Sequence, residues 1–265
     1  MPTQKPWWGD FSFAYQQRRY WSIGERQLVI ERQSCEWNTW NIDTDTENQG
    51  AINYGEYSDH SPILLKDEKL GRHLQTATEE NIRAMPALAD RSIVTRPNVP
   101  LRLLGGEKTT IYVSTPLWFK AMTLPNESVL LDVPFWRPSD SWFGSTTREG
   151  EICYAKYTDA RMQLELLEQR PHRAVTPVFI HNKQKNSLLI ERLNVPVPLL
   201  SLYHHSERGL WTEKVNMSRE DEGDKVTLVL EKQAPSEILG ASLLVGPRIA
   251  SERHTLIRSL GSLFA

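Results

Sequence analysis

The strongest constraint on the fold is how often the chain is interrupted. Sixteen prolines and fourteen glycines are spread along its 265 residues, and both residue types break helices. Between them lie short runs in which apolar and polar residues alternate, such as QLVIER at 27–32 and EWNTWNI at 36–42. A period of two is typical of half-buried strands. We therefore expect a mainly β protein built as antiparallel β-sandwich layers.

Two segments are predicted to form hairpins. In TPVFIHNKQKNSLLIERLNV, the apolar runs Val178–Ile180 and Leu188–Leu193 flank the polar turn NKQKNS, which is the strongest hairpin signal in the chain. Farther upstream, Gly105 and Gly106 stand between alternating residues and predict a second turn.

Two short helices are expected as well. Thr78 precedes two glutamates and could cap a helix near residues 78–90 that ends near Pro86. At the C-terminus, the apolar spacing predicts a short amphipathic helix, with one face formed by Leu256, Ile257, Leu260, Leu263 and Phe264. Such a helix would dock on the protein's own core, or present Leu256, Leu260 and Phe264 to a partner protein or a membrane surface.

Changes in pattern along the chain suggest three regions. Residues 1–95 read as an N-terminal β meander, residues 96–235 as a β-sandwich domain, and residues 236–265 as the helical tail. Pro97 and Pro100, which interrupt regular structure, mark the first boundary. The length fits one large β domain or two ordinary ones.

Charge and hydropathy exclude several classes of protein. The net charge of −2 provides no basic field for nucleic acid. No run reaches the ~18 apolar residues of a transmembrane helix, and the N-terminus has no signal-peptide pattern. A cytoplasmic location is therefore expected, with Cys35 and Cys153 as reduced, buried thiols rather than a disulfide.

The known catalytic and cofactor motifs are missing from the sequence. It contains no phosphate-binding glycine loop, no HExxH and no GxSxG. We expect no cofactor, no metal and no catalytic residue, although a metal site from His172, His181 and either His204 or His205 is geometrically possible. An enzyme is the less favoured interpretation.

The segment Arg137–Arg161 is the densest run of polar and aromatic side chains. It reads as a long ordered loop held by local ion pairs, or as a pocket lining at 137–151. In the second case an anionic ligand is expected, because arginine binds carboxylate or phosphate well. Its candidate ligand-binding residues are Asp140, Trp142, Arg148 and Glu149, completed by Arg170, His172 and Arg173.

Several idiosyncratic motifs carry a resemblance to a known family. They are YVSTPLWF, RPSDSWFGSTTREGEICYA, RPHRAVTPVFIHN, LLIERLNVPVPLLSLY and LWTEKV. The segment from Val99 to Glu231 resembles the domain-of-unknown-function family numbered 432. The resemblance implies no activity and no catalytic residue. Such proteins also resemble companions of mechanosensitive membrane channels.

Four functional hypotheses follow. The first is a binding or accessory protein that acts through protein contacts or a small anionic ligand. The second is a hydrolase or isomerase with its pocket at 137–151, which requires Asp140, Arg148 and Glu149 to gather with a histidine. The third is a carbohydrate-binding β-sandwich, which requires at least two coplanar exposed tryptophans. The fourth is the channel companion that the resemblance implies.

Overall fold

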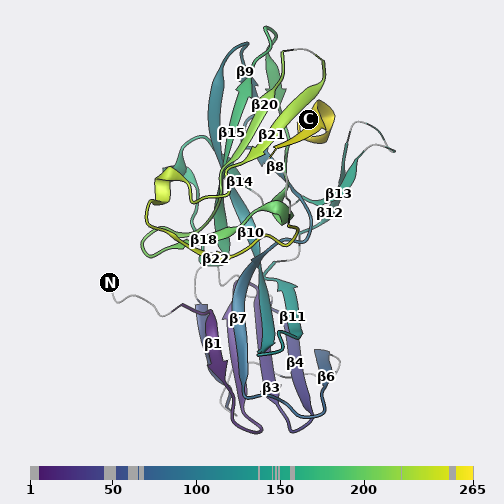
Figure 1. The fold of residues 1–265 in the computed structure, drawn as a ribbon, viewed down its shortest axis with the longest axis vertical. Helices are drawn as coiled ribbons and strands as arrows, with labels where there is room; N and C mark the ends of the chain where they lie inside the picture. Colours follow the sequence, from purple (N-terminus) through teal and green to yellow (C-terminus); the bar gives the residue numbers. More distant parts are fainter. Residues whose placement is uncertain are drawn as a thin grey trace. The chain divides into compact units, whose positions relative to one another are not determined.

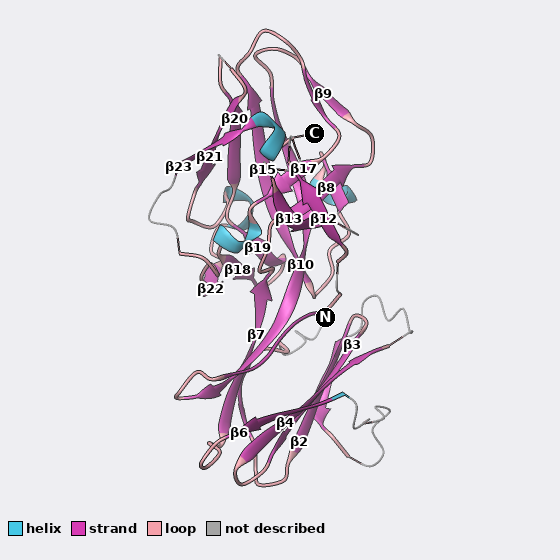
Figure 2. Ribbon diagram, turned by 90° about the vertical axis from the view of Figure 1, so that its right-hand side faces the viewer, coloured by secondary structure: helices cyan, strands magenta, loops and turns pink. Residues whose placement is uncertain are grey.

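A computed structural model describes residues 6–44, 52–58, 65, 69–136, 138–144, 146, 148, 150–155, 159–221, 223–250 and 255–264. Its regular elements are strands and short 3-10 turns (Figures 1 and 2). No helix of seven or more residues occurs in these ranges. The expectation of a mainly β protein is therefore confirmed.

Contacts between Cα atoms divide the chain into two compact units. The first unit comprises residues 1–87 and 117–136, and the second comprises residues 88–116 and 137–265. The long strand β10 (Lys108–Leu124) contributes residues to both. The three sequence regions at 1–95, 96–235 and 236–265 remain a proposal about independent folding, which limited proteolysis would test.

The first unit consists of two groups of strands. One is a five-stranded sheet in the order β5-β2-β3-β4-β6, and the other joins β1, β7, the end of β10 and β11. The bounds are β1 Gly9–Ser12, β2 Arg18–Ile23, β3 Arg26–Arg32, β4 Glu36–Asp43, β5 Ile52–Glu56, β6 Leu70–Leu74, β7 Asn81–Leu88 and β11 Val129–Pro134.

Aromatic side chains fill the core of the first unit. The ring of Trp21 on β2 lies 5.3 Å from that of Phe119 on β10, and Trp7 stacks on Phe119 at 5.8 Å. Phe135 meets Trp7 edge-on at 5.1 Å. All four side chains are buried. Trp7 and Trp21 therefore belong to a core and are not among the exposed tryptophans that a sugar would need.

The second unit is built on one branched sheet. Its path runs β12-β13-β8-β14-β10-β15-β19-β18-β22, and β20, β21 and β23 branch from β15. The bounds are β8 Ile93–Pro97, β12 Asp140–Phe143, β13 Glu151–Tyr154, β14 Asp159–Arg161, β15 Arg173–Asn182, β17 Leu193–Val195, β18 Leu202–His205, β19 Gly209–Thr212, β20 Val215–Arg219, β21 Lys225–Leu230, β22 Ser242–Val245 and β23 Thr255–Ser259. Short 3-10 turns occupy η2 Leu164–Leu166, η3 Val197–Leu199, η4 Ser236–Ile238 and η5 Leu260–Ser262.

The sheet of the second unit is mixed, which corrects the expectation of purely antiparallel layers. Strand β15 is parallel to both β19 and β20, and β8 is parallel to β13 and β14. Parallel neighbours require a crossover connection rather than a tight turn. Local alternation carries no information about such long connections.

The strands of the hairpin predicted at 176–195 are present, but they do not pair with each other. Strand β15 pairs with β10, from Lys108↔His181 to Pro116↔Arg173. Strand β16 (Leu188–Ile190) pairs instead with β9 (Leu101–Leu103). The turn at Gly105–Gly106 is present, with Gly106 at a φ of 79°, but it likewise joins two strands that have other partners.

Both predicted helices are wrong. Residues 81–88 form strand β7. Thr78 precedes this strand, and its hydroxyl donates to the Gln33 carbonyl instead of capping a helix. At the C-terminus, Thr255–Ser259 pair with β21, and Phe264 bridges to Leu193. Short apolar runs fit either period, and in each case an available strand edge satisfies the backbone hydrogen bonds.

Candidate functional site

The segment singled out in the sequence folds as a hairpin of β12 and β13. Asp140 pairs across the strands with Tyr154, and Trp142 with Ile152. Asp140 forms a salt bridge of 3.1 Å with Arg91, and both side chains are about half exposed. An ion pair at the surface contributes little binding chemistry of its own.

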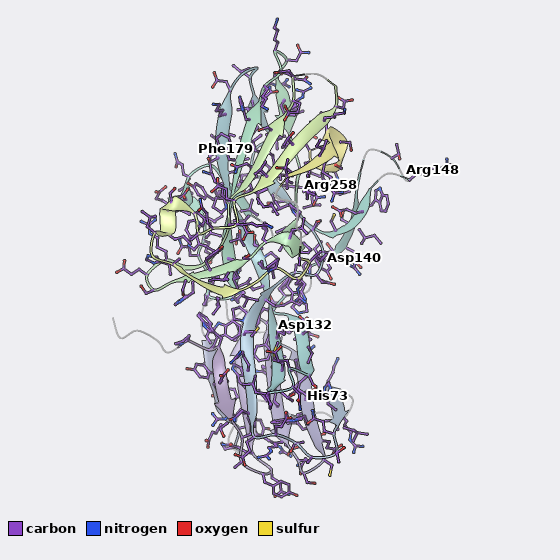
Figure 3. The ribbon with its side chains drawn as sticks, viewed as in Figure 1. His73, Asp132, Asp140, Arg148, Phe179 and Arg258 are labelled. Carbon is purple, nitrogen blue, oxygen red and sulfur yellow. The ribbon has the colours of Figure 1, made fainter. Side chains whose placement is uncertain are left out.

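The end of this hairpin is held by its own hydrogen bonds. The indole nitrogen of Trp142 donates to the carbonyl of Thr146 at 2.9 Å, and the Arg148 backbone N–H donates to the Thr146 hydroxyl. Gly150 is required here, because a Cβ atom would lie 2.6 Å from the Phe143 carbonyl oxygen. Arg148 is exposed at the outer end of the hairpin (Figure 3). Glu149 lies outside the described residues.

The basic turn at 170–173 lies elsewhere in the sheet. Strands β13, β8, β14 and β10 separate β12 from β15, on which Arg173 lies. Arg170 forms a salt bridge of 2.7 Å with Glu168, and Arg173 donates to the hydroxyl and the carbonyl of Ser114. Of the seven candidate residues, the six that the structure describes are therefore not gathered around one pocket, and the role of all seven in ligand binding stays a prediction.

His172 is buried between these arginines. Its side chain is 8% exposed. Burial, helped by the positive charges of Arg173 and Arg170, lowers the pKa of His172 to about 4. The imidazole is therefore neutral at pH 7, so it cannot provide the positive charge that an anionic ligand would need.

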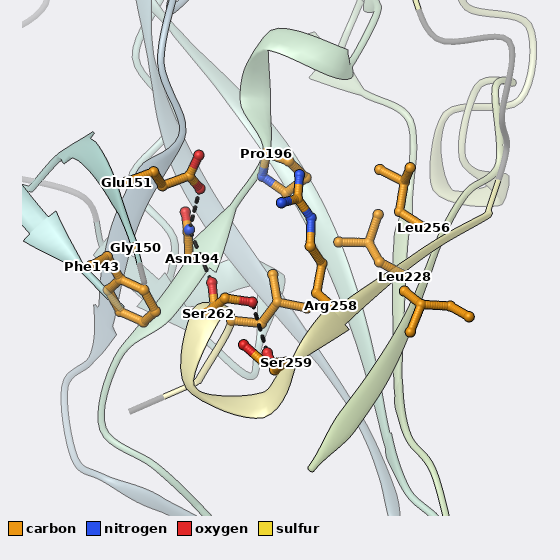
Figure 4. A pocket seen from close by; sticks show the side chains of 12 residues that line it. Phe143, Gly150, Glu151, Asn194, Pro196, Leu228, Leu256, Arg258, Ser259 and Ser262 are labelled. Carbon is orange, nitrogen blue, oxygen red and sulfur yellow. Dashed lines mark hydrogen bonds between the residues drawn. The ribbon is translucent and has the colours of Figure 1, made fainter. Parts of the chain in front are cut away.

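A groove of about 430 Å³ occurs in the second unit. It lies between the C-terminal segment, strand β17 and the end of the hairpin that adjoins the connecting loop (Figure 4). Its lining residues are Phe143, Gly150, Glu151, Asn194, Pro196, Leu228, Leu256, Ile257, Arg258, Ser259, Ser262 and Leu263.

One wall of the groove is a chain of hydrogen bonds. Asn194, which is 2% exposed, donates from Nδ2 to the Glu151 carboxylate at 2.7 Å and to the Ser262 carbonyl at 3.2 Å. The Ser262 hydroxyl donates in turn to the Ser259 carbonyl at 2.7 Å. These hydrogen bonds hold the C-terminal turn η5 against β17. They also give the Glu151 carboxylate, which lines the groove, one hydrogen-bond donor.

Cys153 lies behind this wall, and its thiol is unreactive. Its Sγ lies 3.8 Å from the Asn194 Oδ1 atom. Burial, together with the nearby Glu151 carboxylate, raises the pKa of the Cys153 thiol to about 12. The thiol is therefore protonated at neutral pH, as expected for an inert buried cysteine. Cys35 is exposed rather than buried, and neither cysteine forms a disulfide.

Arg258 supplies the cationic group of the groove. Its guanidinium makes no hydrogen bond or ion pair with any residue in the described ranges. Figure 4 shows the Arg258 side chain between Glu151 on one side and Leu228 and Leu256 on the other. An unpaired guanidinium next to apolar walls can bind the carboxylate or phosphate of an amphipathic molecule.

A second, more polar groove occurs in the first unit. It has a volume of about 380 Å³ and is lined in part by Arg18, Glu31 and Glu56. Its cation is already neutralised, because Arg18 forms a salt bridge of 2.7 Å with the buried carboxylate of Glu31. The groove of the second unit is therefore the stronger candidate for an anionic ligand.

Sequence reasoning missed most of this groove. Of its lining residues, Leu256 was expected to contact a partner, but on a helix that does not form. Arg258 is not among the candidate binding residues of the sequence. The one available signal was Asn194, a polar residue within the apolar run LLIERLNV, since a buried amide requires hydrogen-bond partners.

The tryptophans and the histidines do not form the sites considered above. Of the nine tryptophans, all within the described ranges, only Trp142 is exposed, at 44%. No group of three or more His, Cys, Asp or Glu residues that could hold a metal is found among the residues the structure describes. Likewise, no helix within the described ranges has the length and apolar character to span a bilayer.

Comparison with known proteins yields one match. The chain has no match among curated proteins or among solved structures. A family match, by contrast, extends from residue 7 to residue 264, well beyond the Val99–Glu231 segment that carries the resemblance. The chain therefore belongs to the family described as Protein of unknown function (DUF432).

Proposed function

We propose that the protein is a non-catalytic binding protein, and that the groove beside β23 holds the anionic group of a ligand with an apolar body. The observation that supports this most directly is the guanidinium of Arg258, which has no partner among the described residues and lies next to Leu228 and Leu256 in the groove lining. A planar guanidinium can donate two parallel hydrogen bonds to a carboxylate or phosphate. The partly exposed side chain of Leu256 would cover the apolar part of the same molecule.

The enzyme hypothesis has less support from the same residues. A hydrolase or isomerase needs a nucleophile or a base with a shifted pKa in a shared pocket. Cys153 carries a raised pKa of about 12 and lies behind the groove wall, and Asp140 is paired with Arg91 at the surface. The carbohydrate hypothesis lacks a second exposed tryptophan. The channel-companion hypothesis stays a prediction. A cytoplasmic location, which the two unpaired cysteines favour, belongs to the proposal.

A titration with octanoate tests the proposal. Octanoate combines a carboxylate with an apolar chain, whereas acetate offers the charge alone and octanol the chain alone. We expect octanoate to bind more tightly than either in isothermal titration calorimetry. Arg258→Gln should weaken octanoate binding about tenfold or more, the usual effect of losing a charge-assisted hydrogen bond.

Arg148→Gln provides a matched control. Arg148 is also an exposed arginine of the second unit, and it belongs to the pocket predicted from the sequence at 137–151. Octanoate binding that is unchanged in Arg148→Gln and weakened in Arg258→Gln would support the groove. The reverse result, or equal affinity for all three probes, would overturn the proposal.

A further inference from the structure

Strand β23 is an edge strand. Within the described residues it pairs only with β21, from Lys225↔Ser259 to Val229↔Thr255. The opposite side of an edge strand presents unpaired backbone donors and acceptors, to which an extended peptide can add as a further strand. The groove described above lies along this strand.

The hydrogen-bond register shows which backbone groups face outward. The Leu260 N–H donates to the Asp224 carbonyl at 2.7 Å, which continues the β21–β23 ladder by one residue. In an antiparallel ladder, hydrogen-bonded pairs alternate with non-bonded pairs. Arg258 and Leu256 therefore bond to β21, whereas the backbone groups of Thr255 and Ile257 point away from β21, towards the open edge.

The groove is lined by this edge as well as by side chains. Successive side chains of a strand point to opposite faces, so a groove on one face would be lined by every second residue. Four consecutive residues of β23, Leu256–Ser259, line this groove. The outward-facing backbone of Ile257 is therefore accessible from the groove.

The occupant is inferred from Arg258, the cationic residue of the groove lining, which lies there together with the Glu151 carboxylate. Building on the function proposed above, we infer that the groove binds an extended acidic peptide, which pairs with β23 and places an Asp or Glu side chain on Arg258. An apolar residue of the peptide two positions from this acidic side chain would pack on Leu256, which is partly exposed in the groove. A second copy of the chain would bring a second positive charge, that of its own Arg258, to the same edge. An acidic peptide would instead neutralise the charge of Arg258.

Selection from a phage library of random ten-residue peptides on the intact protein tests this inference. We expect enriched peptides to alternate apolar and other residues and to contain an Asp or Glu. For the tightest synthetic peptide, Ile257→Pro should lower the affinity at least tenfold, because proline removes the outward N–H of residue 257 while β21 pairing is retained. Ile257→Val keeps that N–H and should bind normally. Arg258→Gln should weaken binding about ten- to a hundredfold.

Three results would overturn the inference. They are the absence of enriched peptides, enrichment of peptides without acidic residues, and full affinity of Ile257→Pro with unfolding curves that match the wild type. If no peptide is enriched but octanoate still binds through Arg258, the peptide inference fails and the proposed function stands. If neither probe depends on Arg258, both fail. A peptide-independent dimer in light scattering that Ile257→Pro dissociates would replace the peptide with a second copy.

Discussion

Acidification should destabilise the protein through His172. The imidazole is buried, and its pKa in the folded state is about 4 instead of the ordinary 6.5, because burial and then the charges of Arg173 and Arg170 disfavour its protonation. Glu168 acts in the opposite direction, but more weakly. As the pH falls below 6.5, His172 of the unfolded chain therefore binds a proton, whereas His172 of the folded protein stays neutral until the pH approaches 4.

The size of the effect follows from the two pKa values. The stabilising contribution is complete above pH 6.5 and is lost as the pH falls towards 4. At about 1.36 kcal/mol per pKa unit, the loss is about 2 kcal/mol at pH 5 and about 3 kcal/mol at pH 4. That is a large share of the 5–15 kcal/mol stability of a typical domain.

Two measurements on wild type and His172→Gln check this prediction. Urea denaturation at pH 7.5, 6, 5 and 4 should show that the free energy of unfolding of the second unit falls more steeply for the wild type than for the glutamine variant, which cannot titrate. Groups that both proteins share cancel in this comparison. Separately, an NMR titration of the His172 ring protons should report a pKa near 4 in the folded protein. A ring that titrates near 6.5, or parallel pH profiles for the two proteins, would refute the reasoning.

Two further predictions concern stability alone. Trp21→Ala should cost the first unit about 3–5 kcal/mol in urea denaturation, since it leaves a cavity beside Phe119 and removes the hydrogen bond to the Trp7 carbonyl; Trp21→Phe should cost clearly less, and equal costs would argue against a packing origin. Asn182→Ala should cost about 2 kcal/mol, because the buried amide donates to the carbonyls of Leu103, Leu104 and Asn186. Asn182→Asp should be worse still, and a neutral result for both variants would contradict the role of this amide.

The strands could be predicted where the alternation was clear. Residues 18–43 fold as the predicted meander, with the turn at Gly24, whose φ of 57° suits glycine. The pattern works here because each strand pairs with its neighbour in sequence, so a local signal is sufficient. The helix expected at 78–90 failed for the opposite reason, since β7 pairs with β1, far away along the chain.

The candidate site could be predicted only in fragments. Glu151 lies in the pocket predicted at 137–151, and Leu256 lies in the predicted C-terminal helix. Nothing in the sequence connects the two residues. The groove exists because β23 pairs with β21 and Phe264 bridges to Leu193. Neither pairing has a signature in the local sequence, because each joins segments that are tens of residues apart.

The sequence by itself determined the class of the protein, the positions of several strands and the membership of its family. An alternating pattern specifies which side chains share a face, and this property is local. Only the tertiary structure decided which strands pair, which of them run parallel and which lie at an edge of the sheet among the described residues. Those choices depend on backbone hydrogen bonds, which are the same for every residue except proline, and on burial against distant segments. The groove at Arg258 is a product of these long-range choices.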